Sequence, residues 1–429
     1  MRRIYTRFMR IIITVLAVPL LLAAQRDTLS IVSWNLLFFN STKQETTNRL
    51  PSYRTVTDAL DADIIVANEV QENNANGILL FLNSVLNVTV PGKYTVGTMN
   101  NTNGKDSYNA IFFKPEKVQL LANFKYNPVV RDINRFVVLN RTTQDTLHIF
   151  AIHYKAGNQA TDATTRAQES DVVRAGSNAL PAGTNFLILG DFNIYNSAEQ
   201  AYQKLVAVTA GNEGHFIDPI SMPYPANWNW STNAPYHSQS TRVDSLPDGG
   251  SRGGMDDRFD FFLHSKAVVE DGGVKYIPGS YRPYGNNGAI YNKAVTDAAN
   301  TAYSAAIKQA LHDASDHLPV IARYAFSGPV NSVIREERPE IPRAFELKQN
   351  YPNPFNPETI ITFSLSEQAF VTLEVVDLTG RVVATLANET YSAGNYRVKF
   401  NADGLASGTY LAVLRADASV QMRTMLLLK

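Results

Sequence analysis

The chain has 429 residues, a formal net charge of zero and no cysteine. This length exceeds what one hydrophobic core usually serves, so we expect two folded units with connecting segments. The neutral balance gives no overall attraction to nucleic acid or anionic membranes, so any such attraction must be local. The lack of cysteine excludes disulfides, thiolate metal sites and a cysteine nucleophile, and leaves oxygen and imidazole as metal ligands.

The first 25 residues have the order of a secretory signal peptide. Four arginines lie among the first ten residues, followed by an uncharged apolar run over residues 11–22 and the small pair Ala23-Ala24. We therefore predict a signal peptide over residues 1–25 and export of the protein. The run is shorter than the roughly 20 apolar residues that cross a bilayer, and no later segment qualifies, so we predict no transmembrane segment in the mature chain.

Residues 26–326 have the pattern of one large mixed α/β domain. Stretches rich in β-branched or aromatic residues predict strands, and apolar residues that return every three to four positions predict helices. The predicted strands cover residues 30–34, 64–68, 110–113, 136–139, 147–153, 186–189, 259–263 and 320–323, and the predicted helices cover residues 47–60, 76–86, 163–175, 198–207 and 293–313. Several strands are apolar almost throughout, which indicates sheets that are covered on both faces.

The last hundred residues change in character. Residues 327–343 are polar and contain prolines, which predicts an exposed linker. Residues 344–429 hold short alternating segments, such as TIITFSL, VTLEVVDL and TYLAVLRA, separated by glycine, asparagine and aspartate turns. This pattern predicts a small all-β sandwich.

Polar residues recur at the carboxyl ends of the apolar strands in the large domain, where we expect them to project into a shared cleft. The segments are SIVSWN with Asn35, DIIVANE with Glu69, HIFAIH with His153, GDFN with Asp191 and Asn193, RFD with Asp260, and SDH with Asp316 and His317. One such residue is a weak signal, since asparagine and aspartate often form turns and a lone histidine is usually structural. Six segments in one chain predict a functional site.

The acidic members of this set predict a metal site if they converge. Two unit charges about 4 Å apart repel by roughly 4 kcal/mol at an effective dielectric near 20, so clustered carboxylates either bind a cation or hold protons. Metal binding is the simpler outcome. Oxygen ligands favour a hard ion, Mg²⁺ or Mn²⁺, with Ca²⁺ as an additional candidate. Such an ion suits phosphoryl chemistry, in which developing negative charge must be neutralised.

The order of these motifs resembles the endonuclease/exonuclease/phosphatase superfamily, which includes deoxyribonuclease I. The resemblance covers nearly all of residues 29–326, and GDFN followed far downstream by SDHLPV is its specific pairing. It implies a metal-dependent phosphoric ester hydrolase with a four-layered α/β sandwich, in which two mixed β-sheets are flanked by helices and the active site lies at one sheet edge.

By position, the resemblance implies that Glu69 binds the metal with Asn35 and Asp316 beside it. Asp191 would orient or deprotonate the attacking water, and Asn193 would bind a phosphate oxygen or position Asp191.

Two histidines complete the implied site. His317 would hydrogen-bond the phosphate, with Asp260 holding it protonated and oriented. His153 would be the acid for the leaving group. In deoxyribonuclease I an acidic residue orients this second histidine, whereas here the nearest residues are 105–108. Asp106 fits only with a shift in register, which leaves the acid role of His153 open.

Three further residues are candidates for substrate binding. Arg131, or Arg135, precedes the FVVL strand and would contact a phosphate, although a solvated loop arginine is an equal alternative. Trp228 and Trp230 lie in an aromatic loop that would stack on bases. Packing of this loop on its own domain is the slightly favoured alternative.

The C-terminal region resembles the type A sorting domain of the type IX secretion system, through YPNPFNP, VVDLTGR, LASGTY and the final MLLLK. This resemblance implies the type IX machinery as a partner and outer-membrane export to the surface or medium.

We therefore predict a secreted, monomeric, metal-dependent phosphodiesterase, specifically an extracellular nuclease with DNA or RNA as its partner. The alternatives are a phosphomonoesterase or a sphingomyelinase-type phospholipid diesterase, because the core residues do not separate them. In another class, the alternative is a catalytically inactive surface-binding module.

Overall fold

The computed structural model describes residues 26–71, 76–102, 105, 107–126, 129–220, 227–270, 272–327, 345–417 and 419–428. The predicted signal peptide and almost all of the predicted linker lie outside these residues. The chain divides into two compact units, one up to Asn331 and one from Ser332.

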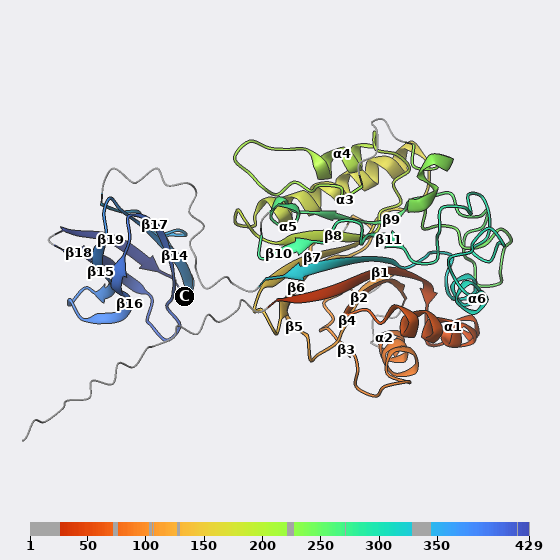
Figure 1. The fold of residues 1–429 in the computed structure, drawn as a ribbon, viewed down its shortest axis with the longest axis horizontal. Coiled ribbons are helices and arrows are strands. Elements are labelled where there is room, and N and C mark those ends of the chain that lie inside the picture. Colours follow the sequence, from red (N-terminus) through yellow and green to blue (C-terminus); the bar gives the residue numbers. More distant parts are fainter. Residues whose placement is uncertain are drawn as a thin grey trace, which may run out of the picture. The chain divides into compact units, whose positions relative to one another are not determined.

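Two β-sheets form the centre of the larger unit (Figure 1). The first has the strand order β10-β12-β1-β2-β4-β3, with β11 also paired to β12, and the second has the order β5-β6-β7-β8-β9. The strands are β1 (Asp27–Phe39), β2 (Ile64–Val70), β3 (Thr95–Val96), β4 (Tyr108–Phe113), β5 (Val118–Tyr126), β6 (Ile133–Asn140), β7 (Thr146–His153), β8 (Phe186–Asp191), β9 (Asp260–His264), β10 (Val274–Tyr276), β11 (Arg282–Pro283) and β12 (Val320–Phe326).

Helices cover the outer faces of both sheets, with α3 and α4 on one side and α1, α2 and α6 on the other (Figure 1). They are α1 (Gln44–Leu60), α2 (Asn76–Phe81), the π-helical turn η1 (Leu82–Leu86), α3 (Ala160–Asn178), α4 (Gln200–Val206), the 3₁₀ helix η2 (Ser231–Tyr236), α5 (Lys266–Val269) and α6 (Ala305–Ala314). The predicted four-layered α/β sandwich is confirmed. No helix in the described part of the chain is long and apolar enough to cross a membrane.

Strand β1 shows why the sheets stack in layers. Successive side chains on a strand point to opposite faces. Leu29 and Ile31 join the core that the two sheets share, whereas Val32 and Trp34 join the core beneath α1 and α6. All four side chains are fully buried, which explains the continuous apolar run in the sequence.

The helix predicted over residues 293–313 is wrong in its first half. Helix α6 begins only at Ala305, where the side chain of Ser304 accepts a hydrogen bond from the first turn at 3.3 Å. The residues before it form a loop around the buried side chain of Asn300, which donates to two backbone carbonyls at 2.7 and 2.8 Å. These side chain–backbone bonds compete with helix formation.

The smaller unit is a sandwich of two antiparallel sheets, which confirms the predicted all-β domain. Their orders are β13-β14-β17 and β16-β15-β18-β19. The strands are β13 (Glu346–Leu347), β14 (Glu358–Leu365), β15 (Ala369–Asp377), β16 (Val382–Tyr391), β17 (Gly394–Asn401), β18 (Gly408–Ala416) and β19 (Ser419–Leu427). Phe355, from YPNPFNP, is buried in the core of this unit. Its backbone N–H donates a hydrogen bond to Leu426 O at 2.9 Å.

Candidate active site

Parallel strand pairs collect four of the predicted residues at one edge of the two sheets. Strands β1 and β2 run parallel, so Asn35, in the carboxyl-terminal half of β1, pairs with Asn68 and lies beside Glu69. In the second sheet β7 and β8 run parallel, and His153 pairs with Asp191. Because parallel strands end at the same edge, these side chains come together.

The RFD and SDH motifs lie at the same edge, but at the starts of strands and not at their ends. Asp260 begins β9, which is antiparallel to β8 and places Asp260 opposite Asp191. Asp316 and His317 precede β12, which is antiparallel to β1. The prediction that all six segments lie at carboxyl ends of strands is therefore wrong for RFD and SDH. The start of an antiparallel strand lies at the edge where its neighbour ends, so the residues still meet.

Asn35 links the two carboxylates at the centre of the cluster. Its Nδ2 atom donates to Glu69 Oε1 at 3.0 Å and to Asp191 Oδ2 at 3.2 Å. The Nε2 atom of His153 lies 3.7 Å from each of the same two oxygens. Glu69, His153 and Asp191 thus present metal-ligating atoms within 4.8 Å of one another. The amide oxygen of Asn35 accepts from Leu37 N, so its role as an oxygen ligand stays a prediction.

Unusual backbone conformations aim the two carboxylates. Glu69 has a positive φ of 58°, and its Oε2 accepts from Phe38 N at 2.8 Å. Asp191 follows Gly190, whose φ is 136° and where an added Cβ would lie 1.9 Å from the carbonyl oxygen of Ile152. Only glycine fits there. Residues held in sparsely populated conformations cluster at functional sites, because the surrounding structure must enforce them.

Asn193 fixes the remaining oxygen of Asp191. Its backbone N–H donates to Asp191 Oδ1 at 3.0 Å, and its side chain donates to Tyr154 O at 3.2 Å. Oδ2 is therefore the oxygen of Asp191 that faces the cluster. The geometry places Asn193 as a positioning partner of Asp191, and its contact with a phosphate oxygen stays a prediction.

His317 is held from its far side by Asp260. Its Nδ1 atom lies 2.6 Å from Asp260 Oδ2, which also accepts from Ser238 Oγ at 2.7 Å. The Nε2 atom of His317 lies 3.8 Å from Asp191 Oδ2. Asp260 is fully buried and His317 is 3 % exposed, so the pair is withdrawn from solvent and presents one ring nitrogen to the cluster.

Asp316 stands next to this pair. Its Oδ2 accepts from Ser251 N at 2.6 Å and from Gln239 Nε2 at 3.4 Å. Its Oδ1 is buried without a hydrogen-bond partner among the described residues. A buried carboxylate oxygen without a donor is costly, and a cation would satisfy it.

Residues 32–317, about two thirds of the chain, match the family model for the endonuclease/exonuclease/phosphatase family. The chain belongs to this family. Its members are phosphoric ester hydrolases, many of them metal-dependent, so the predicted enzyme class is confirmed. Residues 349–427 match the secretion system C-terminal sorting domain, which confirms the second resemblance and indicates export.

Solved structures of similar fold include members of the same family. An endonuclease/exonuclease/phosphatase family protein from Bacteroides thetaiotaomicron has 15% identity and a TM-score of 0.45, over 70% of this chain and 99% of that one. A mannosyl-6-phosphatase from the same organism has 15% identity and a TM-score of 0.44, over 69% and 99%. The human Nocturnin catalytic domain with bound sulfate has 14% identity and a TM-score of 0.42, over 70% and 97%. No curated protein matches the chain significantly.

The electrostatics of this hydrolase site show an excess of buried negative charge. Burial raises the pKa of Glu69, and the charge of Asp316 adds to this effect. Burial also raises the pKa of Asp191 to about 7, with His317 opposing and Asp260 and Glu69 adding to the shift. Carboxylates whose pKa values are raised by burial and by one another's charge form a site that a divalent cation would stabilise.

The pKa values of the two buried histidines shift in opposite directions. Burial disfavours the charged form of His317, but the carboxylates of Asp260, Asp316 and Asp191 outweigh it and hold its pKa well above the ordinary value. Burial lowers the pKa of His153 well below the ordinary value, and the positive charges of Arg131 and His317 add to this. At neutral pH His317 is an imidazolium and His153 is a neutral imidazole.

Ser107 is the partner of His153 that the sequence did not single out. Its hydroxyl lies 3.1 Å from His153 Nδ1, and both residues are buried. Asp106, the other candidate, lies outside the described residues. Ser238, Gln239 and Ser251 were missed as well, because they are loop residues without a motif and only the fold brings them to Asp260 and Asp316.

Of the predicted substrate-binding residues, Trp228 is a wrong assignment. It is 1% exposed, and its ring packs edge-on against Phe261 while the guanidinium of Arg258 lies 5.1 Å from the ring centre. This is the packing alternative, and it leaves no face for a base. Trp230 is 52% exposed. Arg131 donates to Tyr154 O at 3.0 Å, so the substrate-binding roles of Trp230 and Arg131 stay predictions.

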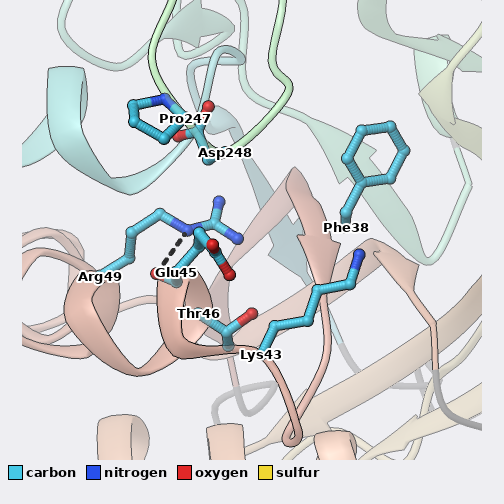
Figure 2. Close-up of a pocket in the computed structure, with 7 residues that line it drawn as sticks. All are labelled: Phe38, Lys43, Glu45, Thr46, Arg49, Pro247 and Asp248. Atoms are coloured by element: carbon cyan, nitrogen blue, oxygen red, sulfur yellow. Dashed lines mark hydrogen bonds between the residues drawn. The ribbon is translucent and has the colours of Figure 1, made fainter.

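A cavity of about 270 Å³ opens between the end of β1, the first turns of α1 and the loop that carries Pro247 and Asp248 (Figure 2). It is lined by Phe38, Lys43, Glu45, Thr46, Arg49, Pro247 and Asp248. No sequence motif marked these residues as a site.

Proposed function

We propose that the protein is a secreted, divalent-metal-dependent phosphodiesterase that hydrolyses DNA or RNA outside the cell. One observation carries the hydrolytic mechanism. Asp191 Oδ2 lies within 4 Å of Asn35, His153 and His317, which come from distant segments of the chain. A carboxylate oxygen faced by an amide, a neutral imidazole and an imidazolium suits the attack of water on a phosphate ester.

The residues present fit a divalent cation. Glu69 and Asp316 would hold it, since the first has a raised pKa and the second has a buried oxygen without a donor in the described structure. Oxygen donors favour Mg²⁺ or Mn²⁺, and Ca²⁺ is a further candidate. When bound, the ion would neutralise part of the negative charge of the phosphate. Many members of the family are metal-dependent, which supports the same assignment.

Asp191 prepares the water. Asn193 occupies Oδ1, so Oδ2 is left to orient the water and to accept its proton as the water oxygen bonds to phosphorus and the bond from phosphorus to the leaving oxygen breaks. Asn35 donates to this same Oδ2 and to Glu69, which keeps the proton acceptor and the metal carboxylate at a fixed separation. Preorganised groups of this kind avoid reorganisation during the reaction.

His317 stabilises the charge that develops on phosphorus. Asp260 binds Nδ1 and keeps the ring protonated, so Nε2–H, which contacts the side-chain amide of Gln239 at 2.5 Å, would donate to a non-bridging phosphate oxygen once substrate displaces that contact. His153 is neutral and its Nε2 faces the cluster. We infer that it donates a hydrogen bond to the phosphate or leaving oxygen, because a neutral imidazole is a weaker acid than the imidazolium first considered.

We further propose the domain limits as predicted from the sequence: a signal peptide over residues 1–25, the catalytic domain over 26–326, a linker over 327–343 and the sorting domain over 344–429. The match to a secretion sorting domain supports export through the type IX machinery to the surface or the medium. We propose that the mature enzyme acts as a monomer.

Metal removal and a substrate panel test this proposal. We expect the full chain to cleave plasmid DNA or RNA in Mg²⁺ or Mn²⁺, to lose this activity with EDTA, and to regain it when the ion is restored in excess. Sphingomyelin and p-nitrophenyl phosphate serve as the lipid and monoester arms. Turnover that is insensitive to EDTA contradicts metal dependence, and preference for either of the latter substrates contradicts the nuclease assignment.

A further inference from the structure

Phe38 is an exposed aromatic residue on a distorted part of β1. Its side chain is 37 % exposed. Leu37 and Phe38 both have a positive φ, of 48° and 45°. The pairing of β1 with β2 shifts register between Asn35 and Phe39 at this point. Side chains with a Cβ rarely adopt such backbone angles, and bulges next to active sites often re-aim a side chain. The distortion turns the Phe38 ring outward instead of into a core.

The walls of the cavity beside Phe38 belong to segments that hydrogen-bond the carboxylate cluster. On one wall, the backbone N–H of Phe38 donates to Glu69 Oε2 at 2.8 Å. On the other wall, the loop that carries Asp248 continues to Ser251, whose N–H donates to Asp316 Oδ2 at 2.6 Å. A group in this cavity therefore lies next to the carboxylates proposed to hold the metal, where it would be attached to the reacting phosphate.

The charged side chains that line the cavity are formally balanced, with Lys43 and Arg49 against Glu45 and Asp248. The guanidinium of Arg49 donates to the carbonyl oxygens of three residues, Leu36, Leu37 and Ala314. Asp248 is paired with Arg242 at 2.6 Å. Lys43 Nζ donates to Gln71 Oε1 at 3.1 Å and lies 5.8 Å from the centre of the Phe38 ring, whereas Glu45 has no side-chain partner among the described residues. Because two positive and two negative side chains line the cavity, it favours an uncharged ligand with polar groups over a second phosphate.

We propose that this cavity binds the nucleoside esterified to the reacting phosphate, with Phe38 stacking on its base. The proposal rests on the proposed function. Aromatic side chains stack on bases of any sequence, and Lys43 and Glu45 supply a donor and an acceptor for base or sugar polar atoms. The cavity, at about 270 Å³, lies just below the range of roughly 300–1,000 Å³ for ligand pockets. Its only apolar lining residues are Phe38 and Pro247, which disfavours a lipid tail.

Two chromogenic diesters test this proposal. The p-nitrophenyl ester of thymidine 5′-phosphate and methyl p-nitrophenyl phosphate release the same leaving group. They differ only in the second ester group, which is thymidine in the first compound and methyl in the other. We expect the wild-type chain with Mn²⁺ to prefer the thymidine ester in kcat/KM. Phe38→Ala is expected to reduce the ratio of the two kcat/KM values roughly 5- to 100-fold, the range measured for loss of one base-stacking contact.

Two further variants make the result specific. Phe38→Trp keeps a stacking face and is expected to keep most of the ratio. Phe124→Ala removes an aromatic residue of similar exposure, 46 %, from β5 and is expected to leave the ratio at the wild-type value. A wild-type ratio near one, or an equal loss on both esters in Phe38→Ala, overturns the nucleoside site. Absence of turnover of both esters by the wild type is a separate result that contradicts the proposed function itself.

Discussion

The His317 side and the His153 side of the active site hold the same kind of ring in different ways. His317 Nδ1 faces the buried carboxylate of Asp260 at 2.6 Å, whereas His153 Nδ1 faces the hydroxyl of Ser107 at 3.1 Å. Both rings are nearly inaccessible to solvent. Burial lowers the pKa of both rings, but at His317 the carboxylates of Asp260, Asp316 and Asp191 outweigh it, whereas at His153 the charges of Arg131 and His317 add to it.

This difference divides the work between the two rings. In the proposed mechanism, a charged ring at His317 would stabilise negative charge on phosphate, and a neutral ring at His153 would donate a hydrogen bond without adding a second positive charge. Two adjacent imidazoliums would repel each other in a site of low dielectric. A serine hydroxyl beside His153, in place of a carboxylate, leaves that ring neutral and so avoids the repulsion. The contrast between the two sides can be tested by mutation.

The His317 side gives the largest expected effect. We expect His317→Ala and Asp191→Ala each to lower kcat by roughly 10²- to 10⁴-fold, the contribution typical of acid–base groups. Asp260→Asn is expected to lower kcat as well, because the ring loses the carboxylate that keeps it protonated. Steady-state kinetics give the rates, and circular dichroism with thermal melting shows whether each variant is folded. A folded variant with the wild-type rate would remove His317 from the mechanism.

The His153 side gives a smaller expected effect. Ser107→Ala leaves Nδ1 of His153 without its hydroxyl partner, and we expect kcat to fall roughly 10-fold, as when the orienting partner of a site residue is removed. Ser107→Thr keeps the hydroxyl and is the matched variant, expected to retain more activity than Ser107→Val, which has the same shape. Equal losses in the Thr and Val variants would show that Ser107 serves packing and not the orientation of the ring.

The pH dependence of stability gives the smallest effect and separates the two rings directly. The folded pKa of His153 lies below its unfolded value of about 6.5, so below that pH the unfolded chain binds a proton that the folded chain does not, and stability falls. His317 has the opposite sign: its stabilisation is full below pH 6.5 and is lost as pH rises through its raised pKa.

We expect His153→Asn to flatten the loss of stability below pH 6.5 by up to about 1.4 kcal/mol per pH unit. The free energy of unfolding in urea, measured between pH 6.5 and 5 for the wild type and the variant, checks this slope. Parallel curves for the two proteins would place the acid sensitivity in other groups and argue against a neutral His153.

The sequence alone determined the fold class, the family and most of the site, because these depend on signals that are local. Apolar strand segments predict buried sheets whatever their neighbours, and motifs such as GDFN and SDH carry the residues together with the strand and turn that present them. The β-sandwich of the sorting domain was readable for the same reason. Only strand β5 escaped prediction in the second sheet, where its exposed apolar residues, Leu121 and Phe124, break the expected alternation.

The tertiary structure decided everything that depends on which distant residue fills a given space. It buried Trp228 against Phe261, started α6 at Ala305 and brought Ser107 to His153. It also turned Phe38 outward through backbone angles that no pattern of residue types announces. Sequence periodicity records which face of an element is apolar, whereas partners, strain and burial of single side chains are set by the packing of segments that are far apart in the chain.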